Sequence, residues 1–483
     1  MPSARKAPRP FRVAVVGSGP AGFFLAERLL GVKDPLIEVD MYERLPTPYG
    51  LVRFGVAPDH EKIKNVTRSF EQTARREGFR FFGNVEVGRH VSLDDLRRHY
   101  HQVCFATGAQ TDRRLGIPGE DLLRSHTATE FVAWYNGHPD YRDREFDLGV
   151  ERVAVVGIGN VAVDVARMLC RTPEELARTD VADHALVQLG RSGVKEVYML
   201  GRRGPAQAAF TTPEVRELGE LEGADLVILP EEAELDPLSR ESLEQRGDRA
   251  LEKKVQAVAE MAGRPLRGRP RTLTIRFLVS PVEFLGGRDG RVVGMRIVRN
   301  RLEDDGGGRL RARATSETEE LPVQLVFRSV GYRGVPIPGL PFDERRATVP
   351  NVKGRVCESV DSARPLRGIY VSGWIKRGPI GVIGTNKPDA RETAQAMLED
   401  ASWGVTLAPE HTDEDAAVRL VRERQPDYIS FTDWMRIDTA ETERGRALGR
   451  PRVKFTSVSE MLAVLGRGGG PASRDTSRYC WVR

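Results

Sequence analysis

The chain of 483 residues carries a net charge of +5, and 40% of its residues are hydrophobic. Its mean hydropathy of −0.40 is typical of a globular protein and excludes a fibrous or largely disordered chain. No apolar run approaches the roughly 20 residues of a membrane-spanning helix. The first ten residues, MPSARKAPRP, lack the apolar core of a secretory signal. We therefore expect a cytoplasmic protein without integral membrane association.

The cysteines argue against a metal or disulfide centre. They are Cys104, Cys170, Cys357 and Cys480, and they form no CxxC pair. No closely spaced set could hold zinc or an iron–sulfur cluster, so no metal site is predicted. Acidic residues are interspersed with the basic ones and no basic stripe carries aromatic residues, so nucleic-acid binding is not expected.

The first predicted element is a buried strand at residues 11–16, FRVAVV, followed by the glycine turn GSGPAG and a helical pattern. GxGxxG directly after a strand is typical of a dinucleotide-binding turn. Gly17 permits the tight turn, Gly19 lets a pyrophosphate approach the backbone, and Gly22 lets helix and strand pack closely. Amide groups at the start of the helix then face the phosphate charge.

The next predicted strand, LIEVDMYE at residues 36–43, ends on an acid. Glu43 lies where a carboxylate can accept hydrogen bonds from ribose hydroxyls. A carboxylate at this point would repel a 2′-phosphate. The first turn is therefore predicted to bind an adenosine diphosphate group that lacks one.

A second strand and glycine turn follow in RVAVVGIGNVA at residues 152–162. The turn and the start of its helix contain Gly159, Asn160 and Val161. The next strand ends on Arg202 and Arg203, whose guanidinium groups can hold a dianionic 2′-phosphate. We therefore predict NADP rather than NAD here. A polar helical insertion at 172–189 makes the spacing longer than usual.

Two linkers divide the chain. The strand HQVCFATGAQ is followed by GIPGED, and QLVFRSVGYRG is followed by PIPGLPF. Because the second glycine turn lies between these linkers, we expect one domain inserted into another, in an α/β fold with two Rossmann-like dinucleotide-binding domains. The predicted ranges are 1–112 and 340–483 for the outer domain and 113–339 for the inserted one. We also expect surface helices at 231–272 and a mobile tail over the last twenty residues.

The two turns differ in the sign of the charge beside them, which implies two different dinucleotides. Flavin plus NADPH is the chemically sensible pair, because a flavin accepts a hydride and releases electrons singly. The outer domain is then the FAD-binding domain and the inserted one the NADP-binding domain.

Several longer strings resemble those of a known family. They are LPTPYGLVRFGVAPDH at 45–60, GRRGPAQAAFTTPE at 201–214, GWIKRGPIGVIGTNK at 373–387, and the terminal patterns DWMRID and GRPRVK. On these strings the sequence resembles adrenodoxin reductase and its bacterial ferredoxin–NADP reductase relatives, from about residue 11 to 465. The resemblance implies FAD and NADP(H) as cofactors, with the NADP domain inserted into the FAD domain.

The resemblance also implies site residues. The implied FAD contacts are Ala21, Glu43, Leu51, Val85, Trp374, Gly381, Val382 and Ile383. The implied NADP contacts are Gly159, Asn160, Val161, Arg202, Arg203, Glu214 and Gly381. His60 and Glu214 are implied beside the nicotinamide and the flavin, where they would orient the nicotinamide and move protons.

A separate physical argument supports the loop that begins at Gly381. The chain continues GVIGTNKPDARETAQAMLED, with Pro388 suited to a first helical turn and apolar residues on one face. Amides at a helix N-terminus would stabilise the negative charge that hydride arrival leaves near N1 of the flavin. We therefore expect a helix start that points at the flavin.

The predicted activity is that of a ferredoxin–NADP(+) reductase. A hydride passes from C4 of NADPH to N5 of FAD, and single electrons then pass to an acidic ferredoxin-type iron–sulfur protein. Such a partner favours a basic docking face on a monomeric reductase. The resemblance puts this face in the NADP domain, where the basic residues are Lys253, Lys254, Arg264, Arg267, Arg269, Arg271 and Arg276.

Three alternatives compete with this interpretation. A disulfide reductase would also use FAD and NADPH but needs a CxxC pair, which the sequence lacks. A flavin monooxygenase shares both glycine turns and would be revealed by oxygen uptake coupled to a substrate. A non-catalytic NADPH-binding flavoprotein would fail to reduce cytochrome c or ferricyanide with NADPH.

Overall fold

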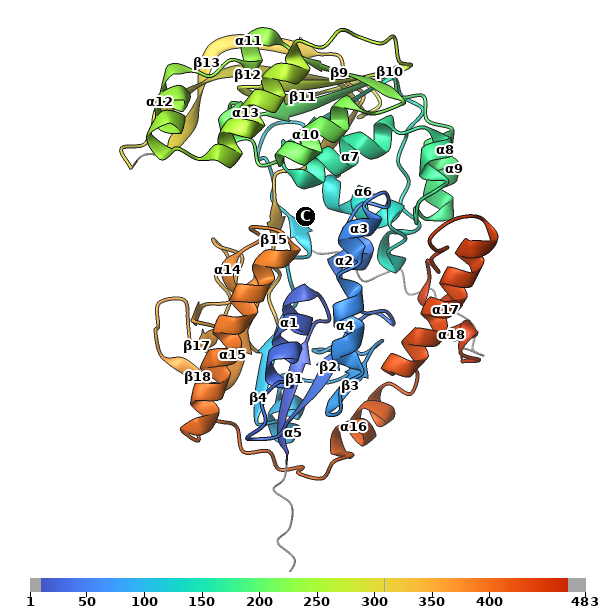
Figure 1. Ribbon diagram of the computed structural model, residues 1–483, viewed down its shortest axis with the longest axis vertical. Coiled ribbons are helices and arrows are strands. Elements are labelled where there is room, and N and C mark those ends of the chain that lie inside the picture. The colour runs from blue at the N-terminus through green and yellow to red at the C-terminus, as the bar shows by residue number, and fades with distance from the viewer. Residues whose placement is uncertain (1–9, 308, 468–483) are drawn as a thin grey trace, which may run out of the picture.

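The computed structural model describes residues 10–307 and 309–467, which form two units stacked end to end (Figure 1). The first unit, at the bottom of Figure 1, is built on a seven-stranded sheet, and the second unit, at the top, on a six-stranded sheet. The strands of the first unit are β1 (Phe11–Val16), β2 (Ile37–Tyr42), β3 (Phe79–Phe82), β4 (Gln102–Phe105), β16 (Asn351–Val352), β17 (Arg355–Cys357) and β18 (Pro365–Val371).

The sheet of the first unit has the order β16-β17-β18-β4-β1-β2-β3, and the five strands from β18 to β3 are parallel. Val13, Ala14 and Val15 in β1 are fully buried, as expected for a strand covered on both faces. The chain runs from β1 to β2 on one side and returns to β4 on the other. The carboxyl ends of β1 and β4 therefore border the crevice where open α/β sheets bind ligands.

The sheet of the second unit repeats this plan, and all of its strands are parallel. Its strands, in sheet order, are β6 (Ser125–Thr127), β14 (Leu325–Arg328), β7 (Arg152–Val156), β8 (Glu196–Gly201), β10 (Arg271–Phe277) and β9 (Ala224–Ile228). The equivalent crevice lies between the carboxyl ends of β7 and β14. The predicted α/β class with two Rossmann-like units is confirmed.

An antiparallel sheet of three strands lies beside the second unit (Figure 1). Its strands are β11 (Val279–Gly286), β12 (Val292–Asp304) and β13 (Leu310–Leu321). A hydrophobic cluster that contains Phe284, Met295 and Ile297 joins this sheet to Val156 and Leu200 of the parallel sheet. The added sheet therefore shares a core with the strands that carry the second glycine turn.

Two short strands connect the units. The strands β5 (Thr111–Asp112) and β15 (Tyr332–Arg333) pair in antiparallel fashion, so both chain crossings run side by side. Every named strand of the first sheet precedes β5 or follows β15, and every named strand of the second sheet lies between them. The second unit is thus an insertion within the chain of the first.

Helices cover both sheets. Those of the first unit are α1 (Pro20–Leu29), α2 (Leu51–Phe54), α3 (Glu61–Lys64), α4 (Thr67–Ala74), α5 (Leu93–His99), α14 (Trp374–Arg377), η3 (Ile383–Thr385), α15 (Asn386–Ser402), α16 (Ala416–Arg424), α17 (Phe431–Ala447) and α18 (Val458–Val464). Those of the second unit are α6 (Ala128–Tyr135), η1 (Pro139–Tyr141), α7 (Asn160–Cys170), α8 (Pro173–Leu176), α9 (Asp183–Gly190), η2 (Pro205–Gln207), α10 (Thr212–Gly219), α11 (Pro230–Ala233), α12 (Pro237–Arg246) and α13 (Arg249–Ala262).

One predicted element needs correction. The surface helices expected at 231–272 are present as α11, α12 and α13, but the range ends inside β10, which lies between β8 and β9. The segment RTLTIRF buries alternate residues, Leu273, Ile275 and Phe277, because it is a strand within a sheet. Most of the predicted C-terminal tail lies outside the described residues. Among residues 10–307 and 309–467, no helix has the length and hydrophobicity that a bilayer crossing requires.

Candidate active site

The first glycine turn leaves open space where the sequence predicts a pyrophosphate. Gly17 has φ +106°, and a Cβ there would lie 2.5 Å from the carbonyl oxygen of Ala106 in the segment after β4. A Cβ on Gly22 would lie 2.1 Å from the carbonyl oxygen of Gly17, so helix and strand pack too closely for a side chain. A Cβ on Gly19 meets nothing within 4 Å. The three glycines thus have the geometry that a dinucleotide turn requires.

Glu43 lies directly beside this turn. Its Oε2 accepts hydrogen bonds from the backbone N of Ser18 at 3.2 Å and from the Ser18 hydroxyl at 2.6 Å. Its backbone carbonyl accepts a hydrogen bond from the backbone N of Val85 at 2.9 Å, which brings Val85 to the same edge. Leu51 begins α2 next to Gly50, where a Cβ would lie 3.1 Å from the Cα of Gly19. The structure therefore gathers these predicted FAD residues around one turn.

Trp374 lies on the other side of the same crevice. It begins α14 directly after Gly373, where a Cβ would lie 2.6 Å from the Cβ of Ala21. The Trp374 ring lies 5.4 Å from the ring of Tyr332, and its buried Nε1 has no hydrogen-bond partner among the described residues. The Thr107 hydroxyl oxygen is buried without a partner as well. Buried polar atoms without a partner are rare, and a bound ligand can satisfy them.

The predicted loop after Gly381 leads into a helix, as expected. Gly381 has φ +86°, η3 follows, and α15 begins at Asn386, with Pro388 in its first turn. Val382 is 54% exposed, and Ile383 packs partly against the core of the first unit. The exposed apolar loop and the adjacent helix N-terminus are suited to cover an aromatic ring that becomes negatively charged.

The second glycine turn repeats the geometry of the first. Gly157 has φ +129°, and a Cβ there would lie 2.2 Å from the carbonyl oxygen of Ser329 after β14. The nearest heavy atom to a Cβ on Gly159 is 3.9 Å away. Asn160 begins α7, and its buried Oδ1 has no hydrogen-bond partner among the described residues. Val161 is half-buried against the core of the second unit.

Arg202 and Arg203 follow β8, as predicted. The backbone carbonyl of Arg202 accepts a hydrogen bond from Asn300 Nδ2 at 3.0 Å, which holds the strand end in place. Within the described residues, neither guanidinium group has a carboxylate within ion-pair distance. Burial, reinforced by the charge of Arg202, lowers the pKa of Arg203. Two adjacent cations without a counter-ion favour binding of an anion.

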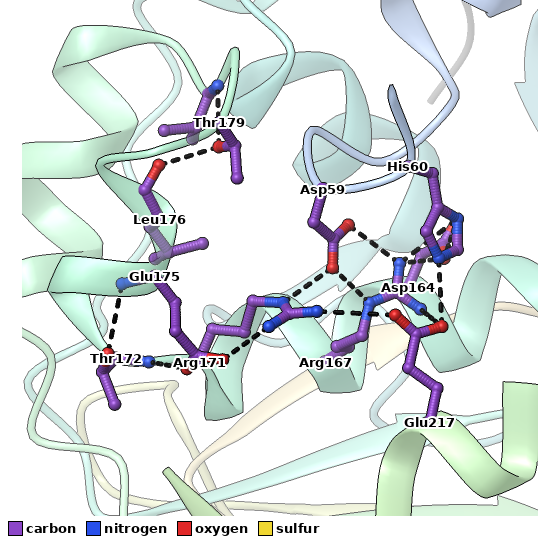
Figure 2. Close-up of polar contacts among 11 residues, drawn as sticks. Asp59, His60, Asp164, Arg167, Arg171, Thr172, Glu175, Leu176, Thr179 and Glu217 are labelled. Atoms are coloured by element: carbon purple, nitrogen blue, oxygen red, sulfur yellow. Dashed lines mark hydrogen bonds and ion pairs between the residues drawn. The ribbon is translucent and has the colours of Figure 1, made fainter. Parts of the chain in front are cut away.

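A buried cluster of charges joins the two units at the centre of the molecule (Figure 2). The Arg167 side chain of α7 is fully buried and donates to Asp59 at 2.6 and 3.0 Å and to Asp164 at 2.8 Å. Arg171, one turn later, also donates to Asp59, at 2.7 Å. Burial opposes ionisation of Asp59, but the two guanidinium groups lower its pKa to about 2. Burial raises the pKa of Asp164 to about 6.

His60 faces this cluster from the first unit. Its Nε2 lies 3.2 Å from Glu217 Oε2 on α10, and its Nδ1 lies 3.5 Å from Arg167 Nη2 (Figure 2). Burial favours the neutral imidazole, yet the hydrogen bond that His60 donates to Glu217 and the charge of Asp164 raise the pKa of His60.

Glu214, which is predicted with His60 beside the nicotinamide and the flavin, does not contact His60 directly. It caps α10, where its Oε2 accepts a hydrogen bond from the backbone N of Thr211 at 2.6 Å. No hydrogen bond or ion pair joins Glu214 to His60 among the described residues, and Glu217, one turn later, takes that contact. The TxxE pattern of a capping box is visible in the sequence and could have indicated the capping role.

Three residues of the same cluster lie close enough together to hold a metal ion. Asp59, His60 and Glu217 each offer one ligand atom, and these atoms lie within 4.8 Å of one another. However, Arg167 and Arg171 already supply two positive charges to these carboxylates. A further cation would be repelled, so we assign no metal to the cluster.

The His60–Glu217 contact predicts a pH dependence of stability. Because the pKa of His60 is raised above its ordinary value of 6.5, its contribution is present below that pH and is lost as the pH rises through the folded-state pKa. We expect Glu217→Gln to lower the midpoint of thermal unfolding by about 1–2 °C at pH 6 and by less at pH 8. Glu222→Gln, at an exposed acid beyond α10, is the control. A difference that stays constant with pH would contradict the assignment.

Three of the seven basic residues of the expected docking face have acidic partners among the described residues. Lys254 donates to the carbonyl of Ala208, and Arg271 to the carbonyl of Val194. Three arginines have acidic partners. Arg264 pairs with Glu220, Arg267 lies near Asp225, and Arg276 pairs with Glu232 and Glu319. These acids come from helices and strands distant in sequence. Part of the run thus contributes to the scaffold of the second unit, and the docking face stays a prediction.

Known proteins are similar to this chain in sequence and in architecture. The family model for pyridine nucleotide-disulphide oxidoreductases matches residues 11–202. The NADPH-ferredoxin reductase FprA of Mycobacterium tuberculosis is 48% identical over 466 residues, which cover 94% of this chain and 99% of that protein. The chain belongs to the adrenodoxin reductase-type ferredoxin–NADP reductase family.

Further relatives agree with this family. The mitochondrial NADPH:adrenodoxin oxidoreductase of Salvelinus fontinalis is 43% identical over 460 residues, covering 94% of this chain and 91% of that protein. The solved structure of Mycobacterium tuberculosis FprA in complex with NADPH has a TM-score of 0.89 at 47% identity, covering 94% of this chain and 99% of that one. The resemblance seen in the sequence strings is confirmed.

Proposed function

We propose that this protein is an FAD-dependent NADPH:ferredoxin oxidoreductase. When bound, FAD accepts a hydride from NADPH and releases the electrons one at a time. The observation that carries the proposal is the difference between the two glycine turns. One lies beside the carboxylate of Glu43, and the other beside the two guanidinium groups of Arg202 and Arg203, which have no counter-ion among the described residues.

The first unit, residues 1–112 and 340–483, would hold FAD. Gly17, Gly19 and Gly22 admit the pyrophosphate, and Glu43 accepts hydrogen bonds from a ribose. Trp374 would offer its unpaired Nε1, and the loop that starts at Gly381 would lie against the flavin. The open space at Gly19 and the two buried polar atoms without partners support this fit.

The second unit, residues 113–339, would bind NADPH. Asn160 and Val161 lie at the N-terminus of α7, where amides attract the pyrophosphate. Arg202 and Arg203 form charge-assisted hydrogen bonds with the 2′-phosphate. His60 of the first unit, with its partner Glu217, would be available to exchange a proton at Nε2. Glu214 would act by holding the start of α10 rather than by direct contact with His60.

We propose a ferredoxin-type iron–sulfur protein as the electron acceptor, and a cytoplasmic monomer as the working form. The net charge of +5 favours an acidic partner. We expect kcat/KM for ferredoxin to fall roughly tenfold between about 0.05 M and about 0.5 M salt. Reduction of the neutral acceptor menadione is the control, since its rate should not follow ionic strength. A flat salt profile for ferredoxin would contradict an electrostatic docking.

The activity itself is tested by NADPH-dependent reduction of cytochrome c through added ferredoxin. The proposal predicts that omission of ferredoxin lowers the rate strongly. Rates independent of ferredoxin would contradict it. Oxygen uptake that requires an organic substrate would instead favour a flavin monooxygenase, and no reduction of any acceptor would favour a non-catalytic flavoprotein.

A further inference from the structure

The second unit contains an insertion that the nucleotide site does not use. Between α7 and β8, where a short connection would suffice, the chain forms α8, a loop at 177–182, and α9. In Figure 1, α8 and α9 reach down from the second unit to the C-terminal segment that carries α17 and α18. Ion pairs between the insertion and the first unit confirm this contact.

Asp180, in the loop of the insertion, binds two lysines of the first unit. Its Oδ1 accepts a hydrogen bond from Lys64 Nζ at 2.6 Å, and its Oδ2 lies 3.2 Å from Lys454 Nζ. Lys454 is 5% exposed and also donates to Asn136 Oδ1, at 3.3 Å. Asp180 is 5% exposed and the Lys64 side chain is 14% exposed, so three charged groups from three distant segments meet largely out of water.

Arg450 donates hydrogen bonds to the backbone of the same loop on both sides of Asp180. Its Nε donates to the carbonyl of Thr179 at 3.0 Å, and its Nη2 donates to the carbonyl of Val181. Its Nη1 pairs with Asp183 at 2.6 Å, the first residue of α9. One guanidinium thus fixes the backbone immediately before and after Asp180. The segment at 450–454 and Lys64 therefore form a clamp around the loop.

The clamp is continuous with the charge cluster at the centre of the molecule. Arg171, which binds Asp59 of the first unit, also pairs with Glu175 at 2.5 Å (Figure 2). Glu175 and Thr172 form the capping box of α8, and the Thr179 hydroxyl donates to the carbonyl of Leu176 at its end. A short, fully bonded helix therefore links the cluster around His60 to the loop around Asp180.

Buried ion pairs are not the simplest way to stabilise the contact between the two units. Burying an ion pair costs desolvation free energy that an apolar contact of similar volume would avoid. An ion pair, however, has a specific geometry. Here the specific geometry sets how the two units face each other. Reactions between two bound partners depend steeply on their relative position, and a misplacement of about 1 Å can lower a rate by about 10²-fold.

We infer that Asp180 is a positioning residue for the reaction between the units, because its ion pairs with Lys64 and Lys454 lock the NADP-binding unit onto the FAD-binding unit. This inference rests on the proposed function. Asp180 touches neither glycine turn and acts only through the orientation of the units.

The test compares Asp180→Asn with Glu174→Gln, which removes an exposed acid from the same insertion. Three quantities are measured on the flavin-loaded protein: FAD content, the Kd of 2′,5′-ADP, and the rate of flavin reduction by NADPH in stopped flow. We expect Asp180→Asn to lower the reduction rate about tenfold. FAD content and the Kd of 2′,5′-ADP should stay within about twofold of the wild type, and Glu174→Gln should match the wild type in all three. Lys454→Met, which leaves Asp180 paired with Lys64, should give a smaller decrease of the same kind.

Three other outcomes would overturn the inference. A reduction rate within twofold of the wild type for Asp180→Asn would overturn the positioning role. Parallel losses of FAD and of 2′,5′-ADP binding would also overturn it, since they would indicate a general loss of folding. Failure of NADPH to reduce the wild-type flavin would overturn the proposed function, and the inference with it.

Discussion

Alanine at both Arg202 and Arg203 is expected to lower kcat/KM for NADPH by about 10²–10⁴-fold. Each charge-assisted hydrogen bond to a phosphate contributes about 1.5–3 kcal/mol, so loss of two removes about 3–6 kcal/mol. The kcat/KM for NADH should change by less than about threefold, because NADH has no 2′-phosphate for the two arginines to bind. Steady-state kinetics with both nucleotides measure this change in preference.

The control for the arginine pair is Arg288→Ala. Arg288 is exposed between β11 and β12 of the same unit, so its loss removes one positive charge without touching the turn. Its kinetics should match those of the wild type. Equal losses with NADPH and NADH in the double variant would contradict a role in 2′-phosphate recognition and would indicate damage to the turn instead.

Valine at Gly19 is expected to abolish tight FAD binding while leaving the fold intact. Gly19 has φ −76°, which valine adopts without strain, and its Cβ would meet no protein atom within 4 Å. The side chain would instead fill the space reserved for the pyrophosphate, and we expect FAD affinity to fall by at least about 100-fold. The ratio of flavin to protein absorbance in the purified protein measures this loss.

Two further glycine variants separate ligand loss from misfolding. Gly263→Val, at an exposed position after α13, should retain FAD. Gly22→Val should unfold or aggregate, because its Cβ would lie 2.1 Å from the carbonyl oxygen of Gly17. Full FAD content in Gly19→Val would show that the cofactor does not pass over this turn.

Local sequence patterns were sufficient for the two nucleotide turns. The glycine spacing of each turn and the charged residue after the next strand, Glu43 or Arg203, can be read from short segments of the chain. A short buried strand followed by glycines at fixed spacing restricts the backbone to few conformations. For this reason the turns, the helix after Gly381 and the α/β class followed from the sequence.

The contacts between units did not follow, because their partners are far apart in the chain. Asp59 contacts Arg167, and Asp180 contacts Lys454, only across the interface between the two folded units. Glu217 rather than Glu214 faces His60 because the capping box of α10 occupies Glu214. Glu232 and Glu319, the acidic partners of Arg276, were not foreseen because they lie in other elements.

The most direct test of the central claim is stopped-flow reduction of the bound flavin by NADPH and by NADH. We expect NADPH to bleach the flavin rapidly, at a rate at least about 100-fold higher than NADH at equal low concentration. A ratio of this size is expected for two guanidinium contacts to a 2′-phosphate. Equal reduction by both nucleotides, or faster reduction by NADH, would contradict the assignment of Arg202 and Arg203 and the function built on it.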